Sequence, residues 1–237
     1  MEKSQSIVLS ETTRNNRSLL FFYLAPYALY VTIPMAIESQ ELIYTLRLLL
    51  VPLVLLFCWK KYIPLNGPNA ISSSVIIGAA TGILGCALWI ALTIPFVPKE
   101  MAAQWSPQAF ALRLAAATLI VPIFEELLVR GYLFLLVLQW QTAKKKGSHS
   151  PLSEALDDCD VGTVEPGAWS VTAILISTLL FASGHQVFEW PAAVVYGLLL
   201  SMLWIVRKDM ISLISAHAVT NFCLALYVFY TGNWGIW

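Results

Sequence analysis

Residues 121–131 read VPIFEELLVRG and place two adjacent glutamates, Glu125 and Glu126, inside a long apolar run. Arg130 follows Glu126 by four residues, so the two side chains can lie on one face of a helix. Ionisable groups are costly in hydrocarbon, by about 3 kcal/mol for Asp or Lys at the centre of a spanning helix on insertion scales. If the run crosses a membrane, two carboxylates within it predict a functional site.

The composition predicts that the run does cross a membrane. Of the 237 residues, 58% are hydrophobic and only 12% are charged, and the mean hydropathy is +0.72. A soluble domain is about 45–50% apolar and about 25% charged. We therefore expect a single integral membrane domain over residues 1–237, surrounded by the lipid bilayer. The formal net charge is zero, and no basic face or base-stacking surface is evident, which argues against a nucleic-acid partner.

Seven apolar runs approach or exceed the about 20 residues that a spanning helix needs. The expected fold class is therefore all-α, a polytopic transmembrane bundle of about seven helices. The fourth run is long and contains Pro122, which predicts a kink or, as the alternative, a break that gives eight crossings. The expected spans are Leu19–Ile37, Leu42–Trp59, Ser73–Val97, Pro107–Trp140, Trp169–Val187, Pro191–Ile205 and Ile211–Tyr230.

Basic residues gather in alternate connecting segments, whereas the opposite segments hold Lys99 alone. By the positive-inside rule, this pattern predicts a cytoplasmic N-terminus and a mobile cytoplasmic loop at 141–167. The core helices of the site are expected within 107–230. The basic residues that set this orientation are Lys3, Arg14, Arg17, Lys60, Lys61, Lys144, Lys145, Lys146, Arg207 and Lys208.

Two further pairs of residues interrupt the apolar runs at a spacing of four: Phe181 with His185, and His217 with Asn221. Taken singly, each pair is typical of hydrogen bonding between membrane helices. Taken with the glutamates, they supply a general base, an imidazole to share the activation of a water, and donors for an oxyanion. These are the parts for hydrolysing an amide. No serine or cysteine lies at a recognisable nucleophile position, which disfavours a covalent route.

In this order, the three motifs resemble the signature of the CAAX prenyl protease and bacteriocin-processing family, the Rce1-like and Abi group of intramembrane proteases. The resemblance extends over about half of the chain. The residues that carry it are Glu125-Glu126-x-x-x-Arg130, Phe181-x-x-x-His185 and His217-x-x-x-Asn221.

The resemblance implies an endopeptidase of the glutamate or metallo type, acting on a membrane-associated peptide or protein. The expected location is a bacterial inner (plasma) membrane. By this resemblance, Glu125 and His185 activate the water, and His217 and Asn221 stabilise the oxyanion. Supporting roles fall to Glu126, Arg130 and Phe181. The cofactor stays open between none and a divalent metal such as zinc, whose ligands would be Glu125, His185 and His217, although the spacing is not H-E-x-x-H.

Two other functions stay open on the residues alone. One is a carrier coupled to protons or ions, with the two glutamates as a relay. The other is a membrane scaffold or immunity protein without catalysis. A shared catalytic site also has a geometric condition, because the predicted depths of His185 and His217 differ by about 12 Å at about 1.5 Å per residue. Tilt or shifted helix ends must remove this difference.

Overall fold

The chain folds into a bundle of helices, seen in a computed structural model that describes residues 14–98 and 104–237. No strand occurs among these residues, so the predicted all-α class is confirmed. Lys3 and Lys99, used above for orientation, lie outside the described residues. The helices are α1 (Asn16–Thr32), α2 (Gln40–Cys58), α3 (Ile71–Thr93), α4 (Pro107–Leu119), α5 (Val121–Leu128), α6 (Phe134–Lys145), α7 (Pro151–Asp157), α8 (Val171–Ser183), α9 (Trp190–Arg207) and α10 (Met210–Thr231).

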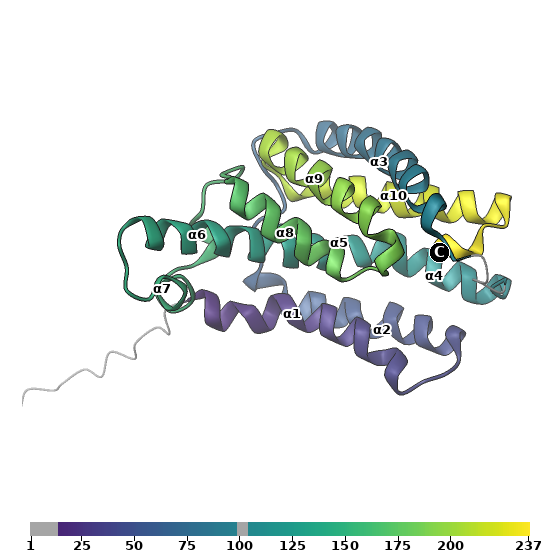
Figure 1. Cartoon of the computed structure of the whole chain (residues 1–237). Coiled ribbons are helices and arrows are strands. Elements are labelled where there is room, and N and C mark those ends of the chain that lie inside the picture. The colour runs from purple at the N-terminus through teal and green to yellow at the C-terminus, as the bar shows by residue number, and fades with distance from the viewer. Residues whose placement is uncertain (1–13, 99–103) are drawn as a thin grey trace, which may run out of the picture.

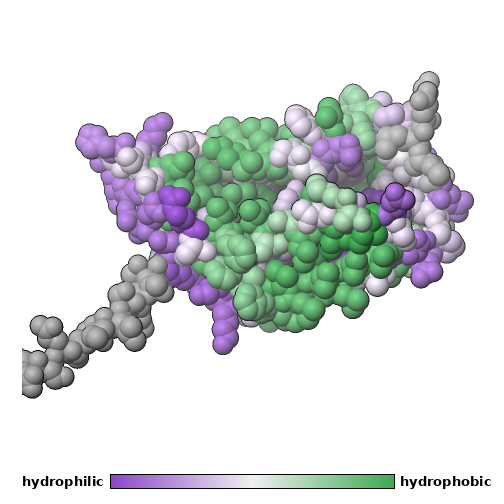
Figure 2. Space-filling model, turned by 90° about the horizontal axis from the view of Figure 1, so that it is seen from below, coloured by the Kyte–Doolittle hydropathy of each residue, from purple (hydrophilic) through white to green (hydrophobic). Residues whose placement is uncertain are grey.

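Five helices, counted with the short 3₁₀ turns that extend them, are long and apolar enough to cross a membrane. They are Asn16–Met35, Gln40–Lys61, Ile71–Phe96, Val187–Arg207 and Met210–Thr231. The helix α8 is apolar but shorter. Figure 2 shows a broad apolar band between two more polar ends, as expected for a surface in contact with lipid. The chain is therefore an integral membrane protein with a polytopic helical bundle.

The long fourth run is a row of helical segments rather than one regular helix. The chain leaves regular geometry at Ile120, where φ is −113°, and Pro122 offers no N–H to the preceding turn. A π-helix, η4 (Val129–Leu133), then joins α5 to α6. Figure 1 shows α4, α5 and α6 following one another across the molecule without a reversal. The break near Pro122 therefore does not create an eighth crossing.

The helix α10 contacts α3, α4, α5 and α9. Two glycines of α3 let it approach closely. A Cβ at Gly78 would lie 2.4 Å from the Ser212 carbonyl oxygen, and a Cβ at Gly82 would lie 2.4 Å from the Ala216 carbonyl oxygen. Small residues allow membrane helices to pack backbone against backbone. This packing fixes the depth and rotation of α10, and with them the position of its polar residues.

The predicted mobile loop at 141–167 is instead tied to the start of α1. The side chain of Asn16 is buried, and its amide donates to the Ala155 carbonyl oxygen over 2.7 Å and to Gln139 Oε1 over 2.6 Å. Its Oδ1 accepts from the Val161 N–H over 2.7 Å. The segment also forms α7, whose Asp157 pairs with Arg17. The polar composition of the segment did not predict this ordered structure, because Asn16, which holds the segment in place, lies in a distant part of the chain.

Candidate active site

The centre of the site is a buried ion pair within one helical stretch. Glu126 on α5 and Arg130 on η4 lie one turn apart, with Arg130 Nη1 3.1 Å from Glu126 Oε2, and both side chains are fully buried. Arg130 also donates from Nη2 to the Gly197 carbonyl oxygen of α9 over 3.2 Å. Its guanidinium carbon lies 4.9 Å from the centre of the Phe181 ring on α8, a cation–π contact. One arginine therefore connects three elements of the bundle.

His217 on α10 lies between the two glutamates. Its Nδ1 is 2.8 Å from Glu126 Oε1, and its Nε2 is 3.9 Å from Glu125 Oε2. A carboxylate can only accept, so Nδ1 carries the proton of the first contact and Nε2 points toward Glu125. This arrangement fixes the rotation of the imidazole and holds a proton on Nδ1.

Glu125 points away from the buried pair, because successive residues of a helix project about 100° apart. Its side chain is 20% exposed and lines a cavity of about 200 Å³. The same cavity is lined by His185 and by Tyr27 of α1. The remaining lining residues are Leu128, Val129, Leu133, Leu180, Phe181, Ser183 and Gly184. The cavity is therefore mostly apolar, with one carboxylate and one imidazole facing it.

His185 does not lie within the predicted helix, because α8 ends at Ser183 and His185 follows in the turn. Its Nδ1 lies 3.0 Å from the Phe181 carbonyl oxygen. A carbonyl only accepts, so Nδ1 carries a proton and Nε2 of the neutral ring holds a free lone pair. The imidazole packs at ring-centre distances of 5.1 Å from Trp89 and 4.8 Å from Phe181.

His185 and His217 lie at similar depths, because the Phe181 ring contacts both of them. The Phe181 ring lies 4.8 Å from His185 and 6.0 Å from His217 between ring centres. One side chain therefore bridges the two histidines, and the end of α8 lies at the level of the first half of α10. The observed helix starts, Val171 for α8 and Met210 for α10, lie within two residues of the predicted ones, so the difference is removed by the relative placement of the two helices and not by shifted helix starts.

Asn221 lies one turn beyond His217 on α10 and contacts the break in the long fourth run. Its Nδ2 donates to the Ala117 carbonyl oxygen over 2.8 Å. Near the break, Ile120 N–H donates back to Ala116 and Ile123 N–H donates to Ile120. The Asn221 amide thus stabilises a carbonyl group at the end of α4, and its second amide hydrogen is not needed for that contact.

Three aromatic residues of the site were missed in the sequence. Tyr27 lines the cavity, Trp89 packs on His185, and Tyr196 lies 5.9 Å from His217 between ring centres. Nothing in their sequence context separates them from the other aromatic residues of a membrane protein. Their importance depends on which helices become neighbours.

The predicted metal ligands do not form a ligand set. Across 14–98 and 104–237, no group of three or more His, Cys, Asp or Glu side chains is arranged to hold a metal ion. Glu125, His185 and His217 therefore do not fit the zinc site considered above, and no step below is assigned to a metal.

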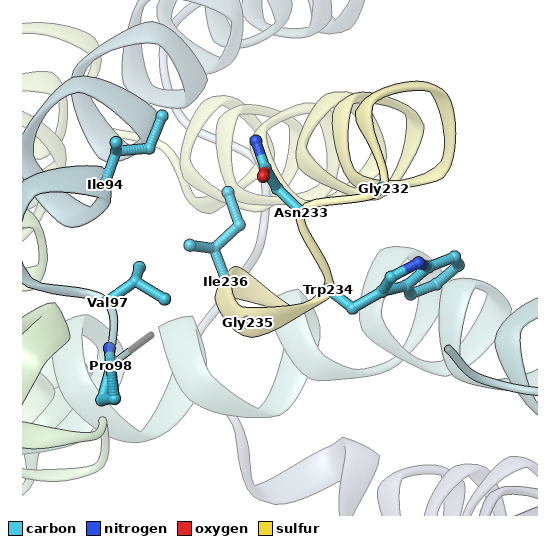
Figure 3. A pocket seen from close by; sticks show the side chains of 8 residues that line it. All are labelled: Ile94, Val97, Pro98, Gly232, Asn233, Trp234, Gly235 and Ile236. Atoms are coloured by element: carbon cyan, nitrogen blue, oxygen red, sulfur yellow. The ribbon is translucent and has the colours of Figure 1, made fainter. Parts of the chain in front are cut away.

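A second cavity, of about 220 Å³, lies between the end of α3 and the C-terminal turn (Figure 3). Its lining consists of Ile94, Val97, Pro98, Gly232, Asn233, Trp234, Gly235 and Ile236. Only the Asn233 amide and the Trp234 indole N–H offer polar side-chain atoms there, and neither is a general base. This cavity therefore lacks the carboxylate and the imidazole that face the cavity of Glu125 and His185.

Fold and site together define a polytopic helical membrane protein with a buried cluster of carboxylates, arginine and histidine. Residues 107–223, just under half of the chain, match the family described as type II CAAX prenyl endopeptidase Rce1-like. All the motif residues fall within that segment, and the predicted resemblance to the CAAX protease family is confirmed. The match supports a CAAX protease-like membrane peptidase. Comparisons with curated proteins and with solved structures gave no match.

Proposed function

We propose that the protein is an intramembrane endopeptidase that hydrolyses a peptide bond with a water activated by Glu125 and His185. The observation that carries this proposal is that these two side chains line one cavity. The cavity is bounded mostly by apolar side chains, and it lies in a protein whose surroundings are lipid. A membrane-associated peptide is the substrate class that reaches such a site, and a bacterial inner membrane is the location we propose for it.

The reaction needs a base, a nucleophile and a proton donor for the leaving group. The Glu125 carboxylate takes a proton from water, while His185 Nε2 accepts a hydrogen bond from the same water and orients it. The water oxygen bonds to the carbonyl carbon, and the π electrons of the carbonyl move to its oxygen. When the C–N bond breaks, protonated Glu125 gives its proton to the amine. The products are a carboxylic acid and an amine, and Glu125 is restored.

His217 and Asn221 are the proposed donors to the developing oxyanion. Donation by His217 uses an Nε2–H, so in this scheme the ring carries a proton on each nitrogen: Nδ1–H donates to Glu126, and Nε2–H, which faces Glu125, donates to the oxyanion. Asn221 uses the amide hydrogen that does not bond to Ala117. In this scheme Glu126 and Arg130 hold the histidine in place, and Phe181 supports both imidazoles.

The experiment compares protein termini in membranes of cells that carry the wild-type protein or Glu125→Gln at equal expression. Glu154→Gln on α7 is the control, because it changes a glutamate that does not line the cavity. New termini that require Glu125 and survive Glu154→Gln support a peptidase and name its substrate. Identical termini in all three membranes overturn the proposal. A proton flux that depends on Glu125 would then identify a carrier, and its absence a scaffold.

A further inference from the structure

One polar side chain of the cavity comes from α1, outside the segment that matches the peptidase family. Tyr27 lines the cavity together with Glu125 and His185. Its ring packs edge-on against Phe124, the residue before Glu125, with 6.1 Å between ring centres. A Cβ built on Gly184, the residue before His185, would lie 3.4 Å from the Tyr27 hydroxyl oxygen. The hydroxyl group therefore lies beside the turn that carries His185.

The hydroxyl group of Tyr27 is free to bind a ligand. Within residues 14–98 and 104–237, no protein group forms a hydrogen bond with it, and the side chain is half-buried. The other tyrosines of α1 differ. Tyr23 accepts from the Ile63 N–H over 2.8 Å, and the Tyr30 ring is covered by the Arg47 guanidinium at 3.8 Å. Tyr27 is thus the tyrosine that α1 directs into the cavity.

None of the other polar groups that line this cavity is available to donate a hydrogen bond to a peptide carbonyl. Glu125 and His185 act on the water in the proposed reaction. Ser183 donates its hydroxyl hydrogen to the Leu180 carbonyl oxygen over 2.7 Å. His217 and Asn221, the donors proposed above, are not among the residues that line the cavity. A peptide carbonyl that enters from the cavity side therefore meets the Tyr27 hydroxyl group as a neutral donor.

We propose that Tyr27 is a further catalytic residue, whose O–H donates a hydrogen bond to the oxygen of the scissile carbonyl from the cavity side. The bond strengthens as negative charge develops on that oxygen, so the group stabilises the transition state more than the bound peptide. No proton is transferred, and the phenol stays neutral throughout. This inference rests on the proposed peptidase function, and it adds a residue that the three motifs do not contain.

Tyr27→Phe tests the inference, because it removes one hydroxyl group and no internal hydrogen bond. Tyr30→Phe is the matched control, since Tyr30 lies on the same helix and also packs against Phe124, at 5.1 Å. The probe is a synthetic peptide that spans one of the Glu125-dependent cleavage sites, added to protein in vesicles of phosphatidylethanolamine and phosphatidylglycerol. We expect Tyr27→Phe to lower kcat about 100-fold with little change in KM, and Tyr30→Phe to stay within about twofold of wild type.

Peptide binding gives a second measurement that does not depend on turnover. In the Glu125→Gln background, adding Tyr27→Phe should leave the affinity for the peptide within about twofold, because the bond matters mainly in the transition state. Wild-type kcat in Tyr27→Phe, or an effect on affinity alone, overturns the role of Tyr27. Full activity in Glu125→Gln instead overturns the peptidase mechanism itself, so the two failures are distinguishable.

Discussion

His217 Nδ1 lies 2.8 Å from Glu126 Oε1, and both side chains are buried. The Glu126 carboxylate therefore has two partners: it accepts a hydrogen bond from His217 and forms an ion pair with Arg130. The two adjacent glutamates divide their tasks: Glu126 holds the cluster together, and Glu125 faces the cavity. The division leads to different expectations for the same substitution at the two positions.

Glu126→Ala should destabilise the protein strongly. It leaves the Arg130 guanidinium buried without its carboxylate, and breaking a buried pair in this way costs about 3–5 kcal/mol. Thermal unfolding in detergent should show a marked fall in melting temperature for Glu126→Ala and little change for Glu125→Ala, whose side chain lies at the cavity. Equal melting temperatures for the two variants would contradict the division of tasks.

Asn221→Ala should reduce turnover more than substrate binding. Loss of an oxyanion donor lowers kcat by about 100-fold, whereas loss of the hydrogen bond to Ala117 should cost only about 1 kcal/mol of stability. Steady-state kinetics on the cleavage-site peptide, with a melting curve for the same sample, separates the two effects. If KM rises and kcat does not change, Asn221 acts in binding and not on the oxyanion.

Gly82→Ala should weaken the packing of α10 and disturb the site at a distance. The new Cβ would lie 2.4 Å from the Ala216 carbonyl oxygen, next to His217, so the backbone of α10 must move. We expect a lower melting temperature together with lower activity. Gly131→Ala is the control, because its Cβ would first meet Ile63 Cδ1 at 3.4 Å, an ordinary contact with a flexible side chain. Unchanged stability in Gly82→Ala would show that α3 and α10 separate easily.

The contact between α7 and α1 should respond to acid. A hydrogen bond from Arg17 lowers the pKa of Asp157 to about 2. Because the pKa is depressed in the folded state, the stabilisation is present above the unfolded pKa of about 3.9 and is lost as the pH falls through the folded value. Asp157→Asn should therefore lower the melting temperature at pH 7, and the difference from wild type should vanish between about pH 4 and pH 2.

Asp158→Asn is the control for this titration, because Asp158 lies beside Asp157 and forms no ion pair among the described residues. Its melting temperature should follow that of wild type at every pH. A difference between Asp157→Asn and wild type that persists at pH 2 would contradict the assignment.

The sequence predicted contacts within one helix better than it predicted the ends of helices. The four-residue spacing of Glu126 and Arg130 correctly predicted one helical face, because that contact is local. The same spacing placed His185 inside a helix, whereas α8 ends two residues earlier and the imidazole bonds to the end of the helix. Gly184 and the polar residues after it end α8, but the apolar residues that resume at Val187 made the run look continuous.

Sequence patterns did not predict several features of the backbone and of the packing between helices. Pro122 predicted an irregularity of the kind seen at Ile120, but no pattern in the sequence predicted the π-helix η4. Order in the polar segment 141–167 depends on Asn16, which lies in α1. Tyr27 joins the cavity because α1 packs against α5. The last two features depend on contacts between residues that are distant in the chain.

The Glu126–Arg130 pair has a consequence for biosynthesis. The two partners lie four residues apart in one helical stretch, whereas His217 joins Glu126 from 91 residues further along the chain. The carboxylate and the guanidinium can therefore neutralise each other as soon as this stretch emerges from the ribosome and enters the bilayer. The charge of Glu126 can therefore be compensated within one helical stretch before α10 joins the bundle.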